Sequence, residues 1–126
     1  YSVISHIMGQ KHSMRFDLTP SCVFSFPEIA WVGVTQEQLE AKMSVYQVRK
    51  ALYRNNGKAI ASNATEGFVK VLIENDSIVG AHIIGKDATV LIHEMAAVIH
   101  QSMSINDFKQ IIHAHPTLSE LFAALF

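Results

Sequence analysis

The clearest pattern of hydrophobic positions lies near the middle of the chain, in two short runs. Residues 67–74 and 78–84 are rich in valine and isoleucine, which favour extended structure. The intervening residues 75–77 read Asn-Asp-Ser, a composition that suits the tight turn of a β-hairpin. The pattern therefore predicts a central antiparallel hairpin, with Gly85 closing its second strand.

Weaker extended patterns precede this hairpin. Residues 22–26 and 28–33 are mostly apolar, with Pro27 between them, and we predict that both are extended. Residues 44–50 alternate imperfectly between apolar and polar positions and are predicted as a further strand. The Asn-Asn-Gly at residues 55–57 indicates a turn, followed by a single helical turn or an irregular connection.

Two short helices are indicated by the residues that would begin them. Thr35 and Gln38 have the spacing of a capping box, in which each side chain bonds the main-chain N–H of the other residue. A helix to about residue 43 is expected to follow. Ser104 is a second expected N-cap, with Asp107 at the third position of its helix.

Two further helices are predicted nearer the C-terminus. The longer runs from Asp87, as N-cap, to about Met103, and its apolar residues lie around much of the circumference, which predicts burial on more than one side. The last helix is predicted from Thr117. Its apolar side chains form one stripe, consisting of Leu118, Leu121, Phe122 and Leu125.

Because strands precede most of the helices, with a hairpin at the centre, we expect an α+β fold, a mostly antiparallel β-sheet flanked by helices. Residues 20–126 would form this domain, with Trp31 and Phe26 in its core. Residues 1–19 lack a clear period and are predicted to be a flank, part helical and part extended. The chain begins at Tyr1 rather than methionine, so we expect a piece of a longer protein.

Composition narrows the class of protein. The chain has 126 residues, 49% of them hydrophobic and 17% charged, with a net charge of -1, which fits one packed domain. The basic residues form no stripe with interleaved aromatic residues, and no apolar run approaches the roughly 20 residues of a membrane span. We therefore expect neither a nucleic-acid nor a membrane partner. The single cysteine, Cys22, suits a reducing compartment and is predicted to be a small buried apolar residue.

The segment 113–120, His-Ala-His-Pro-Thr-Leu-Ser-Glu, carries the candidate chemistry. Pro116 restricts His115 to extended backbone. Thr117 and Glu120 have the spacing of another capping box, which would fold the carboxylate back toward His115. An imidazole held on one nitrogen by a carboxylate keeps its other nitrogen for a substrate proton, so the pair predicts general acid–base chemistry.

Two readings without this chemistry compete with it. The same spacing occurs at many helix starts with a purely structural role. A metal site would need His113 and His115 together with His93 or His100, but alternate residues of an extended segment point apart, so we predict no metal. That alternation also makes one of the two neighbouring histidines a packed or supporting residue, which we assign to His113. His93 and His100 are predicted to be packed or interfacial.

These residues resemble a known family. Segment 113–120 is similar to the C-terminal signature of dihydrolipoamide dehydrogenases, within the pyridine nucleotide–disulfide oxidoreductases. Residues 26–35 (FPEIAWVGVT) resemble the start of that family's interface (dimerisation) domain. Three shorter segments fit in the expected order: 59–62, 67–71 and 79–85. The resemblance covers residues 20–126, and residues 1–19 look like a remnant of the preceding FAD domain.

The resemblance implies a specific enzyme. The family's interface domain is a mostly antiparallel sheet flanked by helices, and it forms much of a homodimer contact. His115 would be the catalytic base and Glu120 its partner, serving the FAD and redox disulfide of the other subunit. The enzyme oxidises dihydrolipoamide with NAD, on lipoyl domains of 2-oxo acid dehydrogenase complexes. The backbone at His115 and Pro116 would face the partner's FAD, and the location would be bacterial cytoplasm or mitochondrial matrix.

The chain also departs from a whole enzyme of that family. It has no Gly-x-Gly-x-x-Gly phosphate-binding motif and no closely spaced cysteine pair. We therefore expect the isolated chain to bind neither FAD nor NAD and to be inactive. Two alternatives stay open, namely the interface domain of a glutathione-reductase type of enzyme and a dimerisation module without chemistry. The first histidine of the segment, His113, favours the dihydrolipoamide type.

Overall fold

The computed structural model describes residues 2–10 and 14–126 of the chain. One five-stranded, fully antiparallel sheet has the order β1-β2-β5-β4-β3. Its strands are β1 (Ser21–Val23), β2 (Glu28–Gly33), β3 (Gln47–Leu52), β4 (Phe68–Glu74) and β5 (Ser77–Gly85). The helices are α1 (Ser2–Ile7), η1 (Phe16–Leu18), α2 (Gln36–Ala41), η2 (Tyr53–Asn55), α3 (Gly57–Ala61), α4 (Ala88–His100), α5 (Ile105–Phe108) and α6 (Glu120–Ala123). The predicted α+β class is confirmed.

The central hairpin forms as predicted. Strands β4 and β5 pair from Phe68–Ile84 to Glu74–Ser77. Asn75 and Asp76 connect them with positive φ angles of 49° and 61°. Two consecutive left-handed residues are what the tightest hairpin turns require, and asparagine and aspartate tolerate that conformation best after glycine.

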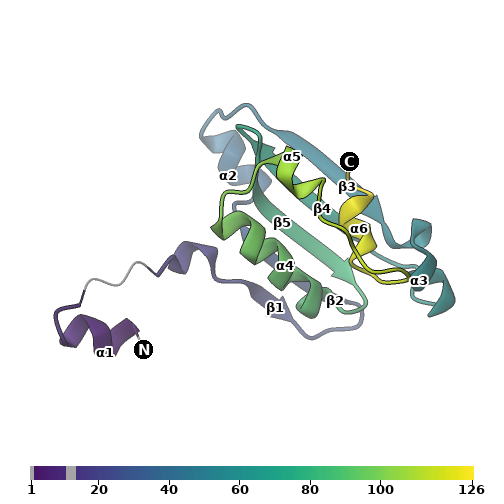
Figure 1. Cartoon of the computed structure of the whole chain (residues 1–126), viewed down its shortest axis with the longest axis horizontal. Helices are drawn as coiled ribbons and strands as arrows, with labels where there is room; N and C mark the ends of the chain where they lie inside the picture. Colours follow the sequence, from purple (N-terminus) through teal and green to yellow (C-terminus); the bar gives the residue numbers. More distant parts are fainter. Residues whose placement is uncertain (1, 11–13) are drawn as a thin grey trace.

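Helix α4 lies across one face of the sheet, over β2 and β5 (Figure 1). Its inward face is buried through Ala88, Leu91, Ile92, Met95, Val98 and Ile99. The prediction of burial on more than one side is wrong for this chain. Val90 is 69% exposed, and His93, Ala97 and His100 continue the same exposed stripe. Within the described ranges, no element covers that side of α4, so its apolar content alone does not bury it.

Glu28, a residue of β2, caps α4 in place of the predicted Asp87. Asp87 has a left-handed backbone and makes no side-chain cap bond. The main-chain N–H and the hydroxyl of Thr89 instead donate to Glu28 Oε2, at 3.0 and 2.7 Å. A carboxylate at the positive end of a helix is favourable. This cap therefore fixes α4 to the sheet. The helix ends at His100 rather than near Met103.

Several predicted strand boundaries are wrong. The first strand ends at Val23, three residues early, and the strand predicted at 44–50 lies at Gln47–Leu52.

Phe26, placed in the core, is fully exposed in the connection after β1. Trp31, also placed in the core, is 36% exposed, because Ala30 and Val32 point toward α4 and side chains alternate along a strand. Cys22 is half-buried against the core rather than enclosed.

The other helix starts follow their predicted caps. Thr35 and Gln38 form the reciprocal capping box of α2, at 2.9 and 3.3 Å. Ser104 accepts a hydrogen bond from the main-chain N–H of Asp107 at 3.1 Å.

The N-terminal flank, residues 1–19, contains α1 and η1, while residues 1 and 11–13 lie outside the described residues. No helix of residues 2–10 and 14–126 has the length and apolarity to cross a bilayer.

Candidate active site

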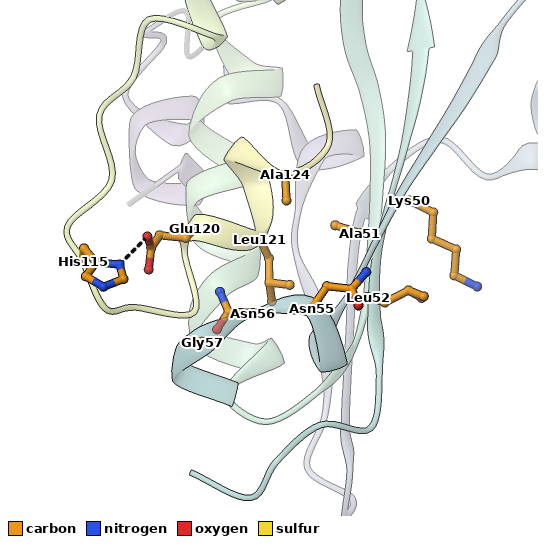
Figure 2. Close-up of a pocket in the computed structure, with 10 residues that line it drawn as sticks. All are labelled: Lys50, Ala51, Leu52, Asn55, Asn56, Gly57, His115, Glu120, Leu121 and Ala124. Atoms are coloured by element: carbon orange, nitrogen blue, oxygen red, sulfur yellow. Dashed lines mark hydrogen bonds and ion pairs between the residues drawn. The ribbon is translucent and has the colours of Figure 1, made fainter. Parts of the chain in front are cut away.

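His115 and Glu120 lie against each other beside the cavity that residues of α3 and α6 line (Figure 2). The Nδ1 atom of His115 is 2.9 Å from Oε1 of Glu120. His115 belongs to the irregular connection between α5 and α6, and Glu120 is the first residue of α6. The His115 side chain is 79% exposed and the Glu120 side chain 29%. The structure thus brings together the two residues that the sequence predicts to interact.

The carboxylate of Glu120 is oriented on both of its oxygens. Its Oε2 accepts a hydrogen bond from the main-chain N–H of Thr117 at 2.8 Å. Only this half of the predicted capping box is present, and the Thr117 hydroxyl donates to the Ala114 carbonyl at 2.7 Å. The chain turns through residues 118 and 119 first, so α6 begins at Glu120 rather than at Thr117. The buried stripe of Leu118, Leu121, Phe122 and Leu125 is confirmed.

The two groups that hydrogen-bond the Glu120 carboxylate also lower its pKa. Two hydrogen bonds hold the pKa of the Glu120 carboxyl below its ordinary value of 4.5. The bond from the Thr117 N–H has the larger effect, and the bond to the His115 imidazole has the next largest. Hydrogen bonds to a carboxylate favour its charged form. Glu120 is therefore ionised at neutral pH and can accept a hydrogen bond from the imidazole.

This lowered pKa predicts a pH effect. A carboxyl whose pKa is lower in the folded state stabilises the fold above its unfolded pKa, and that contribution is lost as pH falls through the lower, folded value. We expect the Glu120 carboxyl carbon to titrate below pH 4.5 in a ¹³C NMR titration of the 126-residue chain. Thr117→Pro, which removes the N–H donor, should move that midpoint upward. An unchanged midpoint in the variant would contradict the assigned cause.

With Glu120 accepting a hydrogen bond from Nδ1–H, the other ring nitrogen of His115, Nε2, is an unprotonated acceptor. No side chain of the described part of the protein hydrogen-bonds this atom. The arrangement can take a proton from an external group, while the carboxylate stabilises the positive charge that the ring then carries.

His113 faces the opposite way from His115, as predicted for alternate residues. Its Nε2 is 2.7 Å from Oε1 of Glu94 on α4, and its side chain is 7% exposed. The ring lies 6.2 Å from the ring of Phe122 on α6, centroid to centroid. The two histidines therefore have separate partners and do not converge on one point. Among the described residues, no group of three or more metal-ligating side chains is present.

Asn56 is a residue of this region that sequence reasoning missed. It was predicted to lie in a turn, but its side chain is buried and accepts a hydrogen bond from the Ala59 N–H at 2.9 Å, which begins α3. Its amide also donates to the Thr117 carbonyl at 3.0 Å. Asparagine is a preferred N-cap, so the first role was readable in the sequence. The contact with Thr117, 61 residues away, was not.

A cavity of about 280 Å³ lies beside Glu120, between β3, α3 and α6. Its walls include Asn55, Asn56, Gly57 and Leu121, and His115 is at its edge (Figure 2). The His115–Pro116 peptide bond is cis. The cavity leaves open space on one side of the acid–base pair.

Comparison with known proteins identifies the family. Residues 19–125 match the sequence model described as "Pyridine nucleotide-disulphide oxidoreductase, dimerisation domain". The chain is 39% identical over 119 residues to dihydrolipoyl dehydrogenase 2, mitochondrial, of Arabidopsis thaliana, covering 93% of this chain and 24% of that protein. It is 39% identical over 121 residues to the mitochondrial dihydrolipoyl dehydrogenase of Sus scrofa, covering 94% and 24%.

A solved structure gives the same result. LpdA of Mycobacterium tuberculosis superposes with a TM-score of 0.88 at 26% identity, over 98% of this chain and 28% of that one. The chain thus spans about a quarter of the length of the relatives it matches. The family match over most of the chain and the shared fold show that this chain belongs to the dimerisation-domain family of pyridine nucleotide–disulfide oxidoreductases.

Proposed function

We propose that the chain is the dimerisation domain of a dihydrolipoyl dehydrogenase, in which His115 is the acid–base residue and Glu120 orients it. The observation that carries this proposal is the His115–Glu120 hydrogen bond together with the exposed second nitrogen of the ring. The relatives that are 34–39% identical include several named dihydrolipoyl dehydrogenases. Membership of a dimerisation-domain family supports a homodimer.

The proposed step is removal of the proton from a thiol of dihydrolipoamide. The S–H bond breaks, its proton moves to Nε2 of His115, and its electron pair stays on sulfur. The resulting thiolate can attack a redox disulfide, which this chain does not contain because it has one cysteine. Glu120 stabilises the imidazolium until the proton is released.

FAD and NAD are implied for the whole enzyme, but the residues of this chain do not fit a complete site for either. The chain has no Gly-x-Gly-x-x-Gly motif, and the lining of the cavity beside Glu120 has a single glycine, Gly57, and so no glycine-rich turn for a pyrophosphate. In this proposal the remaining sequence of the enzyme holds them, with the backbone of His115 and Pro116 toward the partner's FAD. Lipoyl domains are the proposed macromolecular substrates, in bacterial cytoplasm or mitochondrial matrix.

The proposal is tested by a chimera in which this chain replaces the segment of the Sus scrofa enzyme with which it aligns. We expect the chimera to purify as a dimer and to oxidise dihydrolipoamide with NAD. A folded, FAD-containing dimer that reduces glutathione disulfide instead would favour the glutathione-reductase alternative. A folded dimer with neither activity would favour a dimerisation module without chemistry.

Replacing Glu120 with alanine in this chimera should reduce kcat by about 10-fold to 100-fold, less than loss of the imidazole, because His115 can still accept a proton when it is poorly oriented. Steady-state kinetics with dihydrolipoamide measures this effect. Glu66→Ala is the control, since Glu66 is exposed and its side chain has no hydrogen-bond or ion-pair partner among residues 2–10 and 14–126. Equal losses in the two variants would argue against an orienting role.

A further inference from the structure

We infer that Glu94 of α4 is a positioning residue for the acid–base pair, and that it acts through His113. The connection between α5 and α6 is held mainly through one side chain. From Ile112 to Pro116, His113 is the one residue that is not exposed, and Ile112 itself is 96% exposed. The place of this irregular segment, and of His115 within it, therefore depends heavily on the His113 side chain.

His113 is fixed between two helices. On one side its Nε2 meets the Glu94 carboxylate of α4 at 2.7 Å, and on the other its ring lies against Phe122 of α6. The Nδ1 atom is buried and has no partner among residues 2–10 and 14–126. A hydrogen on Nδ1 would be a buried donor without an acceptor, which is costly. His113 therefore holds its hydrogen on Nε2 and donates it to Glu94.

The effect of this contact reaches Glu120 through the backbone. Ala114, the next residue after His113, accepts the hydroxyl hydrogen bond of Thr117 at 2.7 Å. The N–H of Thr117 in turn donates to Glu120 at 2.8 Å. A shift of the segment at His113 would disturb this Thr117 N–H bond, the first cause of the low pKa of Glu120. Glu94 pairs with His113 and neither hydrogen-bonds nor ion-pairs with His115, so its role is to position and not to catalyse.

The first test concerns the geometry and needs no catalytic activity. In the 126-residue chain, we expect the Glu94→Ala variant to lose the hydrogen-bonded Nε2–H signal of His113 in NMR spectra. The Glu120 titration midpoint should move most of the way back toward its ordinary value of 4.5. Glu94→Gln keeps an oxygen that can accept from Nε2–H and should preserve both signals. Glu66→Ala, which removes a carboxylate elsewhere, is the matched control.

A second variant covers the case in which Glu94→Ala fails to fold. His113→Phe keeps an aromatic ring against Phe122 but lacks the N–H, and it should shift the Glu120 midpoint as Glu94→Ala does. The inference is overturned if the midpoint is unchanged in both variants, or if Glu94→Gln behaves like Glu94→Ala.

The catalytic consequence rests on the proposed function and is measured separately in the chimera. Glu94→Ala should lower kcat for dihydrolipoamide by about tenfold, with Glu94→Gln restoring it to within about twofold, the scale of one positioning hydrogen bond. A shifted midpoint with unchanged kcat would overturn the catalytic part of the inference. An inactive parent chimera would count against the proposed function alone, because the NMR result does not depend on turnover.

Discussion

In the chimera, replacing His115 with glutamine is expected to lower kcat for dihydrolipoamide oxidation by about 10²–10⁴-fold, the usual effect of a lost general acid–base group. Glutamine can still hydrogen-bond to Glu120, but it cannot take up a thiol proton near neutral pH. The variant can therefore replace the 2.9 Å hydrogen bond between His115 and Glu120, but it has no group that can act as the base. Stopped-flow or steady-state measurement of NADH formation at saturating dihydrolipoamide reports the loss.

Two controls make this result specific. His6→Gln changes another exposed histidine, on α1, and should leave kcat unchanged. The FAD content and dimeric state of His115→Gln should match those of the parent chimera, because the side chain is 79% exposed and supports no core packing. A kcat within twofold of the parent in a dimeric, FAD-loaded variant would remove His115 from the mechanism.

Phe122→Ala is expected to have the largest effect on stability, lowering the free energy of unfolding by about 3–5 kcal/mol. Phe122 is fully buried on α6 and lies against His113. Truncation leaves a cavity beneath the helix that carries Glu120. Because small domains are stable by only about 5–15 kcal/mol in total, the variant should unfold at a much lower urea concentration.

The matched control for this variant is Phe24→Ala. The side chain of Phe24 is 81% exposed, so its loss should change the free energy of unfolding by no more than about 0.5 kcal/mol. Phe122→Leu, which refills most of the volume, should lie between the two. Urea denaturation of all three chains by circular dichroism gives the comparison. A loss below about 1 kcal/mol for Phe122→Ala would contradict its assigned place in the core.

Much of the fold could be read from local patterns. The hairpin followed from valine- and isoleucine-rich runs around Asn75-Asp76, and the α2 capping box from the spacing of Thr35 and Gln38. The burial of Leu118, Leu121, Phe122 and Leu125 followed from helical periodicity, although only Leu121 and Phe122 lie on the short helix α6. These features depend on residues within a few positions of one another, where backbone preference and side-chain hydrogen bonding act directly.

Local patterns gave wrong predictions in two situations. In one, a residue distant in sequence supplied the contact, and in the other, no element supplied a surface to cover an apolar side chain. Asp87 had the right type for a cap, but Glu28 fills that role from a strand 61 residues from Thr89. Trp31 and Phe26 are as apolar as core residues, yet Phe26 is fully exposed and Trp31 is 36% exposed, because no element of the described structure encloses either side chain. Apolarity predicts burial only when another element supplies the opposing surface. In the proposed homodimer, a second subunit would supply the opposing surface for some of these apolar residues.

The candidate site also combines local contacts, which the sequence predicts, with long-range contacts, which it does not. The sequence alone determined that His115 and Glu120 would be neighbours. The capping spacing of Thr117 and Glu120 turns the carboxylate back toward the residues just before the helix, which include His115. Only the tertiary structure decided that Asn56 holds the Thr117 carbonyl and that Glu94 holds His113. Those partners are 61 and 19 residues apart along the chain, and their meeting depends on how α3 and α4 pack against the sheet rather than on any local preference of the backbone.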